Sequence, residues 1–117
     1  MWVRGNVEII RKLEKDLDDG WKDCVGEGWH PLLYTFARNV DYLVTIGEMP
    51  EVHFTQLKQK FGTLRLYYAG GNDETSRMSA IAEDLSAHMC EVCGRKPSQQ
   101  SNSGWIRTLC EEHRQEK

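Results

Sequence analysis

The chain has 117 residues, of which 39% are hydrophobic and 28% charged, and its formal net charge is −3. This balance is typical of one globular domain, or one domain with a small appendage, and it excludes a disordered chain. No apolar run approaches the roughly 18 residues of a membrane-spanning helix and no secretory signal is visible, so we expect a cytoplasmic protein without membrane contact. Because proteins that depend on phosphate contacts are usually basic, the net charge disfavours a nucleic-acid-binding role.

Two helices are predicted in the first half of the chain. The first is indicated by apolar residues at helical spacing, namely Val7, Ile10, Leu13 and Leu17, and is expected to end near Gly20. The second is indicated by a longer apolar stripe over residues 29–44, which keeps helical periodicity for about four turns. Pro31 lies in its first turn, where the missing N–H costs nothing. Both stripes are expected to face the core.

Residues 52–69 alternate apolar and polar side chains in two runs and predict an antiparallel hairpin with its turn near 59–63. The segment 52–72 has no acidic residue, whereas the rest of the chain is net acidic. Aromatic side chains among positive charges attract acidic partners, so we predict a partner-contact set of Lys58, Lys60, Arg65 and Tyr67. The alternative is that these charges merely solvate the outer face.

A third helix is predicted after Gly70 and Gly71, with Asp73 or Thr75 as its cap. Its expected buried stripe consists of Met78, Ile81, Ala82, Leu85 and Met89. The helix is expected to run straight into Cys90.

The clearest chemical pattern is Cys90-x2-Cys93-x16-Cys110-x2-His113. Three thiolates and one imidazole are a ligand set that zinc prefers, and two residues between paired ligands allow a tight turn around one ion. Gly94 follows the first pair, where such a knuckle often needs a glycine conformation. The order of knuckle, hairpin and ligands at a helix start predicts a treble-clef-like finger. Cys24 stands apart and is expected to be a buried or half-buried thiol.

Other readings of these cysteines are weaker. A redox Cys-x-x-Cys needs neither Cys110 nor His113, and a catalytic zinc keeps one coordination position open. A nuclease of the HNH type needs a histidine base between the ligand pairs, yet residues 94–109 contain no histidine, aspartate or glutamate. Four good ligands therefore favour a structural zinc site and a protein that is not an enzyme.

Four motifs lie within residues 24–113: Gly28-Trp29-x-Pro31-Leu32-Leu33, Lys60-Phe61-Gly62-Thr63-Leu64-Arg65-Leu66-Tyr67-Tyr68, Cys90-Glu91-x-Cys93-Gly94 and Gly104-Trp105-x-x-Thr108-Leu109-Cys110. Together they resemble a family of small, mostly uncharacterised bacteriophage and prophage proteins. In this chain His113 stands where some relatives have a fourth cysteine, which zinc tolerates. The resemblance implies an accessory phage protein in the host bacterial cytoplasm, a class that often inhibits a host defence system or a host enzyme.

The sequence therefore predicts an α+β fold, with helices packed on a small antiparallel hairpin and a C-terminal treble-clef-like zinc finger. Residues 1–87 are expected to form the core, and residues 88–117 a finger continuous with the third helix. The expected function is non-catalytic binding of a host protein. The alternative is a nucleic-acid-binding accessory protein that uses the basic hairpin, and a steep salt dependence of binding would distinguish it.

Overall fold

The computed structural model describes residues 8–96 and 107–114 of the chain. Within these ranges the chain has the predicted α+β fold. The elements, in chain order, are α1 (Lys12–Asp18), the short 3-10 turns η1 (Trp21–Cys24) and η2 (Glu27–Trp29), α2 (His30–Thr45), β1 (Val52–Lys60), β2 (Thr63–Gly70), α3 (Asp73–Ser86) and α4 (Glu111–Arg114).

Helix α1 begins later than its apolar spacing suggests. Ile10, which was expected on the buried stripe, precedes the helix and is 69% exposed, while Val7 lies outside the described residues. The helix begins at Lys12 because a side chain from α2 caps it: the buried Asp41 carboxylate accepts the backbone N–H groups of Leu13 and Glu14 at 2.9 and 3.1 Å. A carboxylate at a helix start satisfies free donors and complements the helix dipole.

Helix α2 is the centre of the core and matches its prediction closely. Its buried stripe consists of Leu32, Leu33, Phe36, Ala37 and Val40, and the fully buried Trp29 ends the preceding turn. The hairpin packs its own apolar face, which includes Leu57, Leu64 and Leu66, into the same core.

The two strands pair in antiparallel register around a tight turn at Phe61 and Gly62. Both turn residues have positive φ angles, 54° and 79°, which match the right-handed twist of a two-residue hairpin. A register shift between Phe54 and Gln56 marks a β-bulge.

Helix α3 covers the free edge of β2. The backbone N–H of Leu64 donates to the Ser86 hydroxyl, and that of Leu66 donates to the Glu83 carboxylate, both at 2.8 Å. These bonds use strand donors that would otherwise be open to pairing with another chain. The cap of α3 is Asn72 rather than Asp73 or Thr75, although Thr75 takes part by accepting the Asn72 N–H.

The predicted buried stripe of α3 is wrong at two positions. Ile81 is 58% exposed and Leu85 is 47% exposed, whereas the buried face carries the small residues Thr75, Ser79, Ala82 and Ser86. Small side chains let the helix approach β2 closely enough for the side-chain bonds to the strand, and this rotates the large apolar residues out of the core. The helix also ends at Ser86, so a turn and not the helix leads into Cys90.

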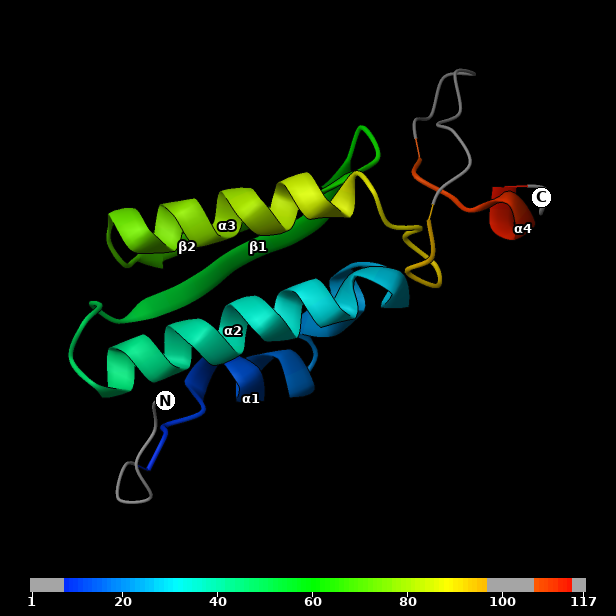
Figure 1. Cartoon of the computed structure of the whole chain (residues 1–117). Helices are drawn as coiled ribbons and strands as arrows, with labels where there is room; N and C mark the ends of the chain where they lie inside the picture. Colours follow the sequence, from blue (N-terminus) through cyan, green and yellow to red (C-terminus); the bar gives the residue numbers. More distant parts are fainter. Residues whose placement is uncertain (1–7, 97–106, 115–117) are drawn as a thin grey trace.

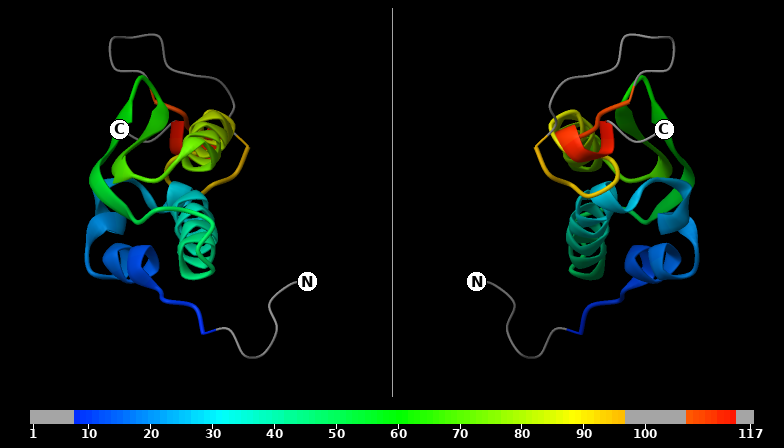
Figure 2. Two further views of the ribbon diagram at one scale, coloured as in Figure 1. Left: turned by 90° about the vertical axis from the view of Figure 1, so that its left-hand side faces the viewer. Right: turned by 90° about the vertical axis from the view of Figure 1, so that its right-hand side faces the viewer.

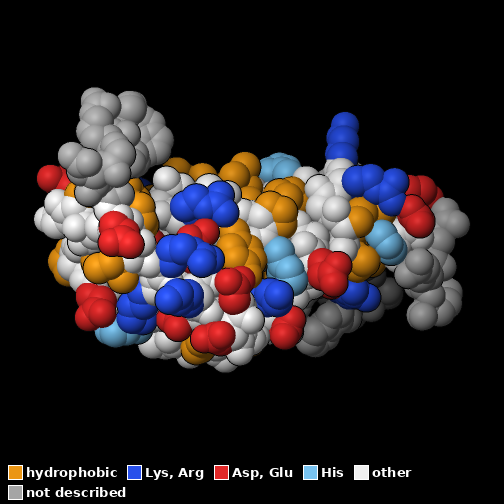
Figure 3. Space-filling view, turned by 90° about the horizontal axis from the view of Figure 1, so that it is seen from below, with side chains coloured by type: hydrophobic (Ala, Val, Ile, Leu, Met, Phe, Trp, Pro, Cys, Tyr) orange, Lys and Arg blue, Asp and Glu red, His pale blue; other side chains and the backbone are white. Residues whose placement is uncertain are grey.

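Figures 1 and 2 show α2 and α3 side by side on one face of the hairpin, with α1 beneath α2. The turn of the hairpin points toward the C-terminal segment that carries α4. Seen from below, positive and negative side chains alternate over the molecule (Figure 3), in keeping with the ion pairs that Arg11, Lys12 and Arg38 make around α1. Among the described residues, no helix is long and apolar enough to cross a membrane.

Candidate metal centre

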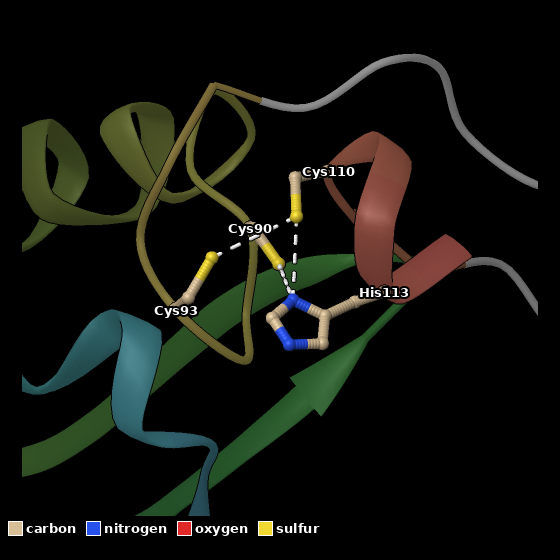
Figure 4. Close-up of side chains that lie close together, drawn as sticks. All are labelled: Cys90, Cys93, Cys110 and His113. Atoms are coloured by element: carbon tan, nitrogen blue, oxygen red, sulfur yellow. Dashed lines mark hydrogen bonds between the residues drawn. The ribbon is translucent and has the colours of Figure 1, made fainter. Parts of the chain in front are cut away.

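The structure brings together the four predicted ligands (Figure 4). Their ligand atoms all lie within 4.8 Å of one another. The sulfurs of Cys93 and Cys110 are 3.7 Å apart, and Nδ1 of His113 lies 3.6 Å from the Cys90 sulfur and 3.3 Å from that of Cys110. Cys90 and Cys110 are buried, whereas Cys93 is exposed. Two segments that are distant in the sequence, residues 90–93 and 110–113, thus lie side by side in the cluster.

These distances fit a tetrahedral metal ion. Bonds of about 2.3 Å to sulfur and about 2.0 Å to nitrogen imply edges of about 3.8 Å between sulfurs and about 3.5 Å from sulfur to nitrogen. The three separations given above match these edges to within a few tenths of an ångström. Four donors on these positions could hold one metal ion and would leave no open coordination position for a substrate.

A backbone knuckle holds the first pair of cysteines. The Gly94 N–H donates to the Cys90 carbonyl at 2.7 Å, and the Cys90 N–H donates to the Arg95 carbonyl at 2.7 Å. Gly94 has a φ of +84°, the conformation expected from its place after the pair. The Val92 N–H points at the Cys90 sulfur at 3.4 Å.

The second pair of ligands lies at the start of α4, as predicted. Cys110 directly precedes this short helix and His113 lies on it. The backbone links the two pairs, because the Glu91 N–H donates to the Thr108 carbonyl at 2.9 Å. Residues 107–110, which lead into α4, have no regular structure. Most of the predicted hairpin between the two ligand pairs lies outside the described residues.

Cys90 and Cys93 are held in an environment that favours the thiolate, which is their metal-binding form. The Arg95 guanidinium donates to the Cys93 sulfur at 3.3 Å and is the main reason that the pKa of Cys93 falls to about 6. Burial alone would raise the pKa of Cys90, but backbone N–H groups, including that of Val92, outweigh it and the pKa is lowered. Thiolates are the form that binds metal.

The pKa values of the other two ligands, Cys110 and His113, are both raised. The N–H of His113 lowers the pKa of Cys110, but burial and the neighbouring sulfurs more than offset it, so this pKa is raised. The bond to Cys90 raises the pKa of His113. Three adjacent sulfurs that repel one another in the ionised state are stabilised by a cation at their centre.

The cluster is fastened to the start of α2 by close backbone contacts that the sequence did not reveal. The Gly28 N–H donates to the Glu91 carbonyl at 3.0 Å, and the Trp29 indole donates to the Met89 carbonyl at 3.0 Å. A Cβ at Gly28 would lie 2.0 Å from the Cys90 carbonyl oxygen, and one at Gly26 would lie 2.1 Å from that of Glu91. Both positions therefore require glycine.

The hairpin turn provides a second anchor. The Thr108 hydroxyl donates to the Gly62 carbonyl at 2.5 Å, and both residues are buried. Arg107 pairs with Glu91 at 2.8 Å, and Arg95 pairs with Glu112 across the cluster. The predicted ligands thus lie where α2, the hairpin turn and the C-terminal segment meet. Cys24, by contrast, is exposed, so the expectation of a buried or half-buried thiol was wrong.

The four predicted partner residues lie on the hairpin and are not part of the ligand cluster. In the register, Lys58 is opposite Arg65, Gln56 opposite Tyr67 and Lys60 opposite Thr63. Their neighbours Leu57, Leu64 and Leu66 face the core, so the predicted set shares the other face.

Fold and site together define an α+β protein with a C-terminal Cys3His cluster that could bind a metal ion. No family model, curated protein or solved structure matches the chain.

Proposed function

We propose that the protein is a zinc-stabilised binding protein without catalytic activity, of the accessory kind that bacteriophages make, which acts in the bacterial host by binding a host protein. The observation that carries this proposal is the pairing of an all-protein ligand set at one end of the molecule with a basic, aromatic face on the hairpin. The resemblance of the sequence to phage proteins supplies the phage origin and the host partner.

Zinc is the metal that the donor set favours. Three thiolates and one imidazole in a tetrahedron suit zinc better than oxygen-seeking cations such as magnesium or calcium. Cys90 and Cys93 on the knuckle and Cys110 and His113 at α4 would hold it. The ion would supply a cross-link that ties the C-terminal segment to the core, where little apolar area is buried.

The outer face of the hairpin carries Lys58, Lys60, Arg65 and Tyr67. It suits a partner contact because its lysines already lie against aromatic rings. The Lys58 ammonium lies 5.7 Å from the centre of the Tyr67 ring, which is 41% exposed. At the turn, the Lys60 ammonium lies 5.6 Å from the ring of Phe61, which is 62% exposed. Exposed aromatic rings beside cations are the side chains that contribute most at interfaces.

Acidic side chains beside the hairpin favour a protein over a phosphate chain as the partner. Arg65 lines a pocket of about 430 Å³ together with Glu83 and Asp84 of α3. Carboxylates there repel a phosphate chain that follows the basic residues, whereas a protein surface can place a cation against them. The same pocket gives a protein partner a means of specificity that charge alone lacks.

The test is a capture experiment from lysate of the bacterial host, with the triple variant Lys58→Glu, Lys60→Glu and Arg65→Glu. We expect the wild type to retain a host protein and the variant to lose it while keeping its fold and metal content. A control with the same charge change elsewhere is Lys15→Glu, Lys22→Glu and Lys96→Glu, which we expect to bind like the wild type. Equal retention by both variants would rule out the hairpin face, and a nucleic acid in the captured material, with a steep salt dependence, would support the alternative.

A further inference from the structure

The sulfurs of Cys93 and Cys110 lie opposite one another at the junction between the two ligand pairs. They are 3.7 Å apart, and Figure 4 shows the two side chains pointing toward each other. Cys93 belongs to the knuckle that follows α3, and Cys110 directly precedes α4. A covalent bond between these sulfurs would therefore join the same two segments that a metal ion in the cluster joins.

Cys93 is the thiol of the cluster that a small solute can reach. It is exposed, whereas Cys90 and Cys110 are buried. The Cys90 sulfur is also enclosed by its own contacts, because the Val92 N–H donates to it at 3.4 Å and Nδ1 of His113 lies 3.6 Å away. An oxidant that enters from solvent therefore meets Cys93 first, and the facing sulfur of Cys110 is the partner within reach.

Hydrogen peroxide is a co-reactant that balances the formation of this bond. The Cys93 thiolate attacks one peroxide oxygen, the O–O bond breaks, and a sulfenic acid and a hydroxide ion form. The Arg95 guanidinium, which donates to the Cys93 sulfur at 3.3 Å, offsets the negative charge of the departing hydroxide. The Cys110 thiolate then attacks the Cys93 sulfur, the S–O bond breaks, and a second hydroxide ion leaves. Two thiolates thus lose two electrons to one peroxide molecule, which is reduced to two hydroxide ions.

From this geometry we propose that Cys93 is an oxidation site and that its disulfide with Cys110 takes the place of the metal ion. The two sulfurs must close from 3.7 Å to about 2.0 Å, which the exposed side chain of Cys93 can do without displacing the core. A bound ion would keep only Cys90 and His113 as ligands and would be released. The C-terminal segment would stay attached, now by a covalent link that closes a loop of 16 intervening residues.

The first test follows zinc and disulfides during treatment with hydrogen peroxide. The protein carries Cys24→Ser, which removes the exposed thiol outside the cluster, and it is loaded with zinc in a reductant that is then removed. Free zinc is measured with a chromophoric chelator, and the disulfides are mapped by mass spectrometry of peptides. We expect one zinc ion to leave for each Cys93–Cys110 disulfide that forms. A chain without this disulfide, or with a Cys90–Cys93 disulfide in its place, overturns the proposal.

The identity of the displaced ion rests on the proposed function, but the two proposals fail separately in this test. A protein that takes up no zinc refutes the proposed zinc site, while its peptides still show whether peroxide joins Cys93 to Cys110. A protein that holds zinc and forms no such disulfide refutes only the oxidation site.

The second test asks whether the disulfide replaces the ion as a cross-link. Melting temperatures are compared for the zinc-bound protein, the reduced protein after chelation and the oxidised zinc-free protein. We expect the oxidised form to melt well above the reduced zinc-free form, because the link restricts the unfolded chain. Cys93→Ser, treated in the same way, should gain no stability from peroxide. An oxidised form that melts no higher than the reduced zinc-free form overturns the proposal.

Discussion

At the scale of single residues, the ligands of the cluster differ in exposure. Cys93 lies at the surface, whereas Cys90 is fully buried. An exposed ligand can be replaced without a change in core packing, so a variant there tests the metal bond itself. Cys24 offers a matched control because it is equally a free, exposed thiol, but it lies on η1 and outside the cluster.

We predict that Cys93→Ser weakens zinc binding by more than roughly 100-fold, since even the loss of an outer partner of a ligand costs about 10–100-fold. The melting temperature should fall, because metal binding in such sites contributes directly to folding. Metal competition with a chromophoric chelator and thermal unfolding measure the two effects. Cys24→Ser should leave both values as in the wild type, and an equal effect of the two substitutions would contradict the assignment of the ligands.

Gly28 provides a test of the contact between the cluster and α2. In Gly28→Ala the added Cβ would lie 2.0 Å from the Cys90 carbonyl oxygen, and neither backbone can move without breaking the Gly28–Glu91 hydrogen bond. We predict a loss of about 2–4 kcal/mol in the free energy of unfolding, measured by urea denaturation.

The control for Gly28→Ala is Gly47→Asn, after the other end of α2. Gly47 has a φ of +82°, which asparagine tolerates, and an added Cβ there meets nothing within 4 Å. This variant should lose under about 1 kcal/mol. If Gly28→Ala is no more destabilising than the control, the close approach is not a constraint on the fold.

At the scale of elements, helix α1 is too short to be stable alone, and ionic contacts of a buried carboxylate stabilise it in the fold. Glu14 is buried and binds both Arg11, at 2.8 Å, and Arg38 of α2, at 3.0 Å. Burial raises the pKa of Glu14, but the hydrogen bonds from the two arginines outweigh it, so the pKa lies below its ordinary value of 4.5. Asp41 shows the opposite balance, because burial outweighs its two backbone bonds and raises its pKa.

This difference gives a pH-dependence test. Because the folded pKa of Glu14 is lowered, its ionised form stabilises the fold above the unfolded pKa, and this stabilisation is lost as the pH falls through the folded value. We predict that Glu14→Gln is less stable than the wild type at pH 7 and that the difference shrinks between about pH 5 and pH 3. Urea unfolding across this range measures it. Glu48→Gln, at an exposed acid, should follow the wild type, and a constant difference for Glu14→Gln would exclude the ionic contribution.

The elements also show which parts of the fold could be predicted from the sequence alone. The long stripe of α2 and the alternation of the strands predicted those elements correctly, because each buries a face with one clear period. Periodicity failed for α3, where Met78, Ile81 and Leu85 suggested the core face and Ser79 and Ser86 occupy it instead. Hydrogen bonds from Ser86 and Glu83 to the edge of β2 decided the orientation, and such bonds between distant segments leave no trace in apolar spacing.

At the scale of the whole molecule, the four ligands were predictable because ligand chemistry fixes both residue type and local spacing. The contacts that surround the ligands could not be predicted in this way. The bonds from Trp29 to Met89 and from Thr108 to Gly62 join segments far apart in the chain, and only the fold brings them together. Gly26 and Gly28 gave the single available signal, since glycines close together before a helix can mark a close backbone approach.

The central claim is that one zinc ion at Cys90, Cys93, Cys110 and His113 fastens the C-terminal segment to the core. Native mass spectrometry of freshly purified protein tests it most directly, because it counts the metal on each chain and identifies it by mass. The account predicts one zinc ion per chain, lost together with the compact charge-state distribution when a strong chelator is added. A wild-type protein that carries well under one zinc ion per chain and is equally compact with or without chelator would contradict it.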